Sequence, residues 1–166
     1  MNGHTPADST RLFKSALAAA AKTATAPLAA PDVPLLVRVG LPTTNQRGRY
    51  GEIIAVTRVV ARQEVAAMGP RRPRELFMTC TVIVSVYRAG SDDEANGVDL
   101  EEQVALRAGE LLDAIEENVR LTDTTLGGVV RECFCTSVEI DEPDEQLNSG
   151  RSAYAIGEFT ARARIT

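Results

Sequence analysis

Two cysteines separated by one residue, Cys133 and Cys135, are the first candidates for chemistry in this chain. On a strand both sulfurs would lie on the same side, because side chains alternate with a period of two. A tetrahedral metal site requires four ligands, and the remaining candidates are Cys80 and His4. A disulfide between the two neighbours would be strained. We therefore expect free thiols, no metal and no cofactor.

Carboxylates are a second source of chemistry, since a hydrolase can use two of them as acid and base. Here they occur in the runs 92–94 and 139–145, which are typical of solvated loops and lack the register of a calcium-binding loop. Gly127 and Gly128 follow a predicted helix, whereas a phosphate-binding loop precedes one. We predict no catalytic activity. A small carboxylate hydrolase is the least favoured alternative.

The composition describes a single ordinary domain of 166 residues, with 44% hydrophobic and 25% charged residues. Aromatic residues make up 4% and Trp is missing, which disfavours base stacking. Eighteen basic and 23 acidic residues give a net charge of −5, so the chain should repel DNA. We expect no membrane span and no signal peptide, and three cysteines favour a reducing cytoplasm during synthesis.

Residues 1–8 are predicted to be a flexible N-terminus, and residues 9–166 a single domain. Asp8 or Ser9 would cap a first helix that ends before Pro27, followed by a connector and a short strand at 35–39. The polar segment 42–51 reads as a surface loop. These elements leave the longest helix for the second half of the chain.

A long acidic helix is predicted from Leu100 to Leu121. Asp99 and Glu102 have the spacing of a capping box, and Asp123 to Gly128 supplies the residues that end the helix. Apolar residues recur along it at steps of three and four, namely Leu100, Val104, Ala108, Leu111, Ile115 and Val119. This stripe should be buried and the other face wet.

Two alternating runs, 53–65 and 76–86, predict a long β-hairpin with a turn at 68–73. In the first run, one face would carry Ile53, Ala55, Thr57, Val59, Ala61 and Val65, and the other Ile54, Val56, Arg58, Val60, Arg62 and Glu64. In the second, one face would carry Leu76, Met78, Cys80, Val82, Val84 and Val86. An arm of roughly 43 Å is as long as the whole domain, so either a bulge bends it or its tip projects.

Runs 131–140 and 152–165 alternate again and predict two closing strands. The fold class is therefore α+β, with a mainly antiparallel sheet of four to five strands, two helices packed on one face and a long β-hairpin.

The order of these elements, with Asp123-Thr124-Thr125-Leu126-Gly127-Gly128 after the long helix and Val37-Arg38-Val39-Gly40 with Pro42 before the hairpin, resembles a known family. It is similar to the tail terminator, or tail-completion, proteins of long-tailed bacteriophages, which include the lambda-type minor tail protein U. The resemblance is architectural and runs from Arg11 to Ile165.

The resemblance implies a non-enzymatic virion protein in the neck region of the tail, assembled in the host cytoplasm. Such proteins form hexameric rings on the head-proximal end of the tail tube, end tube polymerisation and present the surface that joins the head. The implied partners are other copies of the chain, the tail tube protein and a head-completion or connector protein, while DNA passes through without specific binding. The alternatives are another neck or head-completion ring protein, or a monomeric peptide-binding module.

Two groups of charged residues are candidates for contacts in such an assembly. Basic residues in the loop and at the hairpin tip, together with Tyr50, would form the subunit interface: Arg47, Arg49, Arg71, Arg72 and Arg74. Acidic residues between the closing strands would face the channel or a neighbouring ring: Glu139, Asp141, Glu142, Asp144 and Glu145. A solvated outer loop is the alternative for the acidic group.

Overall fold

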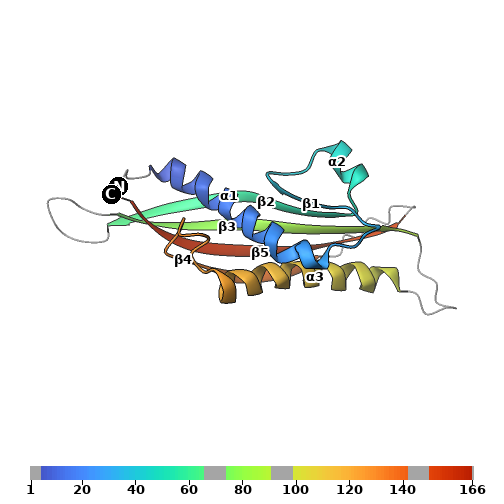
Figure 1. Cartoon of the computed structure of the whole chain (residues 1–166). Helices are drawn as coiled ribbons and strands as arrows, with labels where there is room; N and C mark the ends of the chain where they lie inside the picture. The colour runs from blue at the N-terminus through green and yellow to red at the C-terminus, as the bar shows by residue number, and fades with distance from the viewer. Residues whose placement is uncertain (1–4, 66–73, 91–98, 142–149, 166) are drawn as a thin grey trace.

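The fold is taken from a computed structural model that describes residues 5–65, 74–90, 99–141 and 150–165. Two long helices lie against a sheet of long strands (Figure 1). The helices are α1 (Pro6–Thr25), α2 (Thr44–Arg49) and α3 (Leu100–Glu117), with a 3₁₀ turn at Ala26–Leu28 and a π-helical segment at Asn118–Thr122. The strands are β1 (Leu35–Val39), β2 (Glu52–Val65), β3 (Arg74–Ala89), β4 (Glu132–Asp141) and β5 (Gly150–Ile165).

The sheet has the strand order β1-β2-β3-β5-β4, and the predicted α+β class is confirmed. Strands β2, β3, β5 and β4 are antiparallel to their neighbours, whereas β1 runs parallel to β2. In Figure 1 both long helices lie on the same side of the sheet. We call this side the helix face and the opposite side the open face.

Segment 42–51 was predicted to be a loop, and that prediction is wrong because it contains α2. Thr43 and Gln46 form a reciprocal capping box: the Thr43 side chain accepts from the backbone N–H of Gln46, and the Gln46 side chain accepts from that of Thr43. This short helix is the connection that lets β1 and β2 run parallel.

The first helix also begins earlier than predicted. Its N-cap is Thr5, whose side-chain oxygen accepts from the backbone N–H of Asp8, and Pro6 occupies the first turn. Residues 6–8 therefore form the first turn of α1.

The core lies between the helix face and the two long helices. All six residues of the predicted α3 stripe are buried, as are Phe13, Leu17 and Ala21 of α1. Every second residue of β3 from Leu76 to Val86 is also buried, as the alternation predicted. Gly157 of β5 allows close packing, since a Cβ there would lie 2.9 Å from a methyl carbon of Leu112.

A β-bulge interrupts β2, as one of the two alternatives for the long hairpin expected, and β5 runs along the full length of β3. Val56 pairs with Val82 but Val59 pairs with Cys80, so Thr57 and Arg58 together stand opposite Thr81. The hydroxyl of Thr57 donates to the carbonyl oxygen of Thr81 at 3.0 Å. The extra residue exchanges the two faces of the strand.

The predicted faces of the first run are therefore wrong beyond the bulge. Ile54 and Val56 lie on the helix face before it, and Val59 and Ala61 continue that face after it, opposite the buried Cys80 and Met78. A strict period of two cannot reveal an inserted residue.

The buried stripe of α3 provides a test of the core. Replacing the fully buried Leu111 with Ala should lower the free energy of unfolding by about 2–5 kcal/mol, because the lost methyl groups leave a cavity. Leu106→Ala is the matched control, since Leu106 is 65% exposed, and should change stability by less than about 0.5 kcal/mol. Denaturant melts that give equal losses for both variants would contradict the packing of α3.

Candidate functional site

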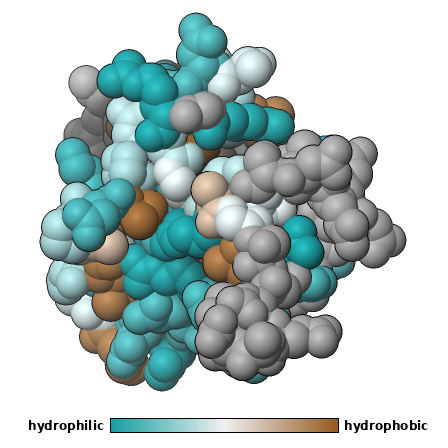
Figure 2. Space-filling view, turned by 90° about the vertical axis from the view of Figure 1, so that its right-hand side faces the viewer, coloured by the Kyte–Doolittle hydropathy of each residue, from teal (hydrophilic) through white to brown (hydrophobic). Residues whose placement is uncertain are grey.

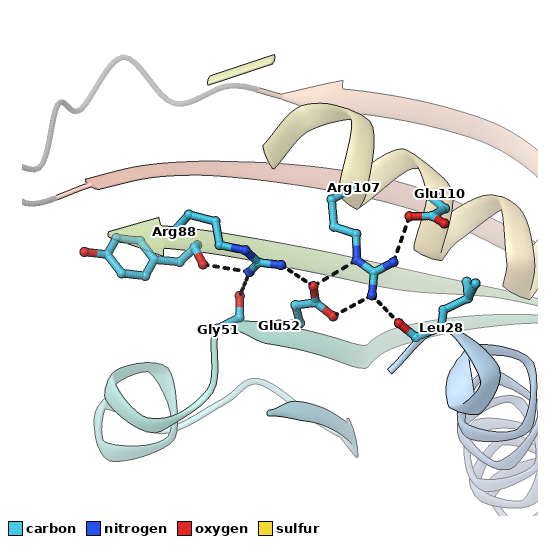
Figure 3. A network of polar contacts seen from close by, with 7 residues as sticks. Leu28, Gly51, Glu52, Arg88, Arg107 and Glu110 are labelled. Carbon is cyan, nitrogen blue, oxygen red and sulfur yellow. Dashed lines mark hydrogen bonds and ion pairs between the residues drawn. The ribbon is translucent and has the colours of Figure 1, made fainter. Parts of the chain in front are cut away.

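A buried carboxylate, Glu52, lies at the centre of the most connected polar cluster among the described residues. Glu52 is the first residue of β2 and is 0% exposed. Two guanidinium groups reach it from different elements, Arg88 from β3 and Arg107 from α3 (Figure 3). Arg107 donates to both carboxylate oxygens, at 2.9 and 3.1 Å, and Arg88 donates to Oε1 at 2.5 Å.

The same guanidinium groups also bind backbone carbonyls. Arg107 donates to the carbonyl oxygen of Leu28 at 2.5 Å and to the Glu110 carboxylate at 2.7 Å. Arg88 donates to the carbonyl oxygens of Tyr87 and Gly51. The Glu52 cluster, defined as Glu52, Arg88, Arg107 and Glu110, therefore links β2, β3, α3 and the segment that follows α1.

The electrostatics of the cluster favour ionised groups. Burial raises the pKa of Glu52, but the hydrogen bonds from Arg107 and Arg88 outweigh that effect and lower the pKa below its ordinary value of 4.5. The hydrogen bond to Glu52 raises the pKa of Arg107. An acid–base catalyst needs a pKa near the working pH. This cluster instead holds fixed charges, which suits the joining of elements.

Sequence reasoning missed the Glu52 cluster. Arg107 had been assigned to the wet face of its helix, and Glu52 directly precedes the fully apolar stretch Ile53–Val56. The signal available in the sequence was a single acid, Glu52, directly before four apolar residues. Its partners Arg88 and Arg107 could not be inferred, because they lie 36 and 55 residues further along the chain.

The three thiols lie on the helix face across neighbouring strands. Cys133 pairs with Ala161 and Cys135 with Phe159, so both cysteines share one side of β4, as predicted. Cys80 also pairs with Phe159, from the other side of β5. All three are free. Burial raises the pKa of Cys80 to about 11 and that of Cys133 to about 12, which makes both thiols poor nucleophiles.

The predicted subunit-interface residues are not gathered in one place among the described residues. Arg47 and Arg49 are exposed on α2, and Tyr50 next to them is half-buried. Arg74 is exposed at the opposite end of the hairpin, about 40 Å away along the strand. Arg71 and Arg72 lie outside the described residues.

Two of the five predicted acidic residues can be placed. Glu139 and Asp141 are exposed at the end of β4, on the open face, because they pair with Ile156 and Tyr154 of β5. Glu142, Asp144 and Glu145 lie outside the described residues.

The turn that carries the family resemblance has a structural explanation. Hydrogen bonds from Thr125 and Gly127 lower the pKa of the Asp123 carboxyl and fix the chain after α3. Leu126, Gly127 and Gly128 all have positive φ, of 51°, 69° and 81°. The α-helix ends at Glu117 and its π-helical continuation at Thr122, so the predicted helix stop at the glycine pair is wrong. The two glycines instead lie in the turn that leads to β4, where left-handed backbone favours glycine.

Ion pairs cross the open face of the sheet between its central and edge strands. Arg162 of β5 bonds to Glu132 of β4 at 2.9 Å and to Glu75 of β3 at 3.0 Å, and it lies over the ring of Phe77. Arg131 also bonds to Glu75, at 2.8 Å. These pairs cover part of the open face with polar groups.

Among the described residues the outer edge of the short strand β1 is unpaired, and so are two longer stretches of strand. β1 accompanies β2 only from Glu52 to Val56, so β2 beyond the bulge pairs with β3 alone. β4 pairs with β5 alone along its whole length. These stretches lie on opposite sides of the sheet. We call them the β2 edge (residues 57–64) and the β4 edge (residues 132–141).

A groove between α3 and β4 adjoins the β4 edge. Leu106 and Ile140 contribute apolar surface, and the carboxylates of Glu102, Glu110 and Asp113 surround it. Figure 2 views the end of the molecule where α3 begins and shows small hydrophobic patches among hydrophilic side chains. Leu106, Val138 and Ile140 are each more than half exposed.

No protein-family model matches the chain, and no curated protein has a significant sequence match to it. Within the described part of the chain, no helix has the length and apolarity to cross a membrane, and no three metal-ligating side chains are grouped. The fold therefore defines the class: an α+β domain with a mixed, mostly antiparallel sheet, against which two long helices pack.

The Glu52 cluster predicts a pH-dependent stability. Glu52→Gln should lower the free energy of unfolding by about 2–4 kcal/mol. The loss should stay below that for breaking a fully buried ion pair, because Arg107 and Arg88 keep 18% and 28% of their side-chain surface exposed. Since the folded-state pKa of Glu52 is lowered, its contribution is present above pH 4.5 and is lost as the pH falls through the folded-state value. The variant should lack this part of the acid dependence.

Denaturant melts between pH 3 and pH 7 measure this effect. Glu110→Gln is the control, because Glu110 is 53% exposed and its removal should cost at most about 1 kcal/mol. A Glu52→Gln loss below that of Glu110→Gln would contradict the role of the cluster.

Proposed function

We propose that the protein is a structural subunit of a phage tail terminator ring, which caps the head-proximal end of the tail tube and forms the surface that joins the head. The observation that carries the proposal is the presence of two unpaired edges on opposite sides of one sheet, the β2 edge and the β4 edge. Because the two edges differ and lie on opposite sides, one edge of a subunit can bind the other edge of the next subunit in a head-to-tail contact. Such contacts close into rings when the rotation between subunits allows it.

The open face provides further support. It carries the acidic residues Glu139, Asp141 and Glu158, and the whole chain has a net charge of −5. Arginines share this face, but Arg162 is held in ion pairs by Glu75 and Glu132, and the negative net charge of the chain would weaken the attraction of a channel for phosphate. The buried polar groups described above join elements of the fold, which suits a non-enzymatic role.

A monomeric peptide-binding module is the second candidate. The β4 edge beside the acidic groove between α3 and β4 favours it, because an extended basic peptide could add a strand there. The two functions differ in solution mass. A module stays monomeric at high concentration, and a ring subunit does not.

The ring is tested with the purified chain. Light scattering should give six times the monomer mass at high concentration, and negative-stain electron microscopy should show rings that bind one end of purified tail tubes. Tube protein polymerised in the presence of the rings should yield shorter tubes. A monomer at all concentrations would contradict the proposal, and rings that bind no tube end would reduce it to another ring protein of the neck.

The acidic loop provides a separate prediction. Changing Glu142, Asp144 and Glu145 to Lys should give rings that still assemble but bind DNA in a salt-sensitive manner, because new cations release counterions from the phosphate backbone. Filter binding at two salt concentrations measures this, with the unchanged rings as control. Assembled variant rings without DNA affinity would place the loop outside the channel.

A further inference from the structure

We propose that the β4 edge of one copy pairs, antiparallel, with the β2 edge of the next copy, so that a continuous sheet runs from subunit to subunit. The inference rests on the proposed ring and names the surfaces that close it. Its occupant is a second copy of this chain. Three features support it: strand direction, the faces on which charges and apolar side chains lie, and the space beside β2.

Strand direction permits the pairing. In the order β2-β3-β5-β4 each strand is antiparallel to the next, so β4 runs opposite to β2. When the sheet continues in the same sense into a second copy, the β4 edge therefore meets the β2 edge in antiparallel orientation. This arrangement satisfies backbone N–H and C=O groups that are otherwise unpaired.

The charges on the open face are complementary. Arg62 lies on the open face because it pairs with Phe77. Arg58 belongs to the bulge and directly precedes Val59, which is on the helix face, so Arg58 lies on the open face as well. On the β4 edge, Glu139 and Asp141 lie on the open face. All four side chains are exposed. Opposite charges on directly facing or diagonal positions of paired strands attract each other.

The helix face is complementary in a different way. Val59 and Ala61 lie on this side of the β2 edge, and Val138 and Ile140 lie on the same side of the β4 edge. Both β4 residues are 51% exposed although their side of the sheet is covered by α3 elsewhere. In the register that sets Arg58 opposite Asp141, Val59 stands opposite Ile140 and Ala61 opposite Val138. Apolar groups thus meet on one face and opposite charges on the other.

The space beside β2 fits one strand. β1 fills the first part of the outer side of β2 and ends at Val39, after which the N–H of Gly40 bonds to the carbonyl oxygen of Val56 at 2.8 Å. The β2 edge begins at the next residue and is eight residues long, and β4 has 10 residues. An incoming β4 strand would thus lie end to end with β1, which limits how far its register can slide.

Charge reversal tests the pairing without touching the core. The first variant is Arg58→Glu with Arg62→Glu, and the second is Glu139→Arg with Asp141→Arg. Each variant alone places like charges across every contact and should raise the concentration for half-assembly at least about tenfold. An equimolar mixture should assemble again as a ring in which the two variants alternate. There the reversed β2 edge of one variant meets the reversed β4 edge of the other, and the unreversed edges meet each other, so every contact joins opposite charges.

Light scattering measures assembly, and circular dichroism checks that each variant keeps its fold. Arg11→Glu, which changes another exposed arginine, is the control and should assemble like the parent chain. Unchanged assembly of either variant overturns the inference, as does a mixture that stays dissociated. If the wild-type chain forms rings and the variants assemble equally well, this interface is wrong and the proposed function stands. If the mixture restores rings that bind no tube end, the interface stands and the terminator role is wrong.

Discussion

The rest of the structure depends on the pairing of β3 with β5. The two strands pair from Arg74 with Ile165 to Ala89 with Gly150, without a register shift. Nearly all of their helix-face side chains are buried, and α3 packs over both strands, whereas α1 lies mainly over β2. β2 then attaches to β3, and β4 attaches to β5, each with its own bulge. Because the central pair fixes both flanking strands, the β2 edge and the β4 edge, which have no strand partner among the described residues, have defined positions and directions.

Both apolar packing and ion pairs stabilise the contact between this sheet and the helices. The core is aliphatic, built from Val, Ile, Leu and Ala with two buried phenylalanines, and it holds the helices without specifying every contact. The Glu52 cluster specifies one contact, because removing Glu52 leaves the guanidinium groups of Arg88 and Arg107 without their shared carboxylate. Its position at the start of β2 ties α3 and the segment after α1 to the side of the sheet where β1 joins.

Periodicity explains what the sequence could predict. The α3 stripe and the alternation in β3 were recognised because each repeats over several turns or strand residues. The bulge at Thr57–Arg58 was missed and its two residues were assigned to opposite faces, because an inserted residue leaves both flanking runs alternating. The helix at Thr44–Arg49 was missed although Thr43 and Gln46 have capping-box spacing, and Glu52 gave no sign of partners that only tertiary folding brings near.

Hydrogen exchange measured on the assembled chain and on a dilute monomer tests the central claim, that the free edges of the sheet pair between copies. Residues 57–64 and 132–141 should exchange quickly in the monomer and become protected together on assembly, because both edges would gain backbone hydrogen bonds. β3 and β5 should be protected in both states. Assembly that leaves either edge exchanging as fast as in the monomer would contradict the account.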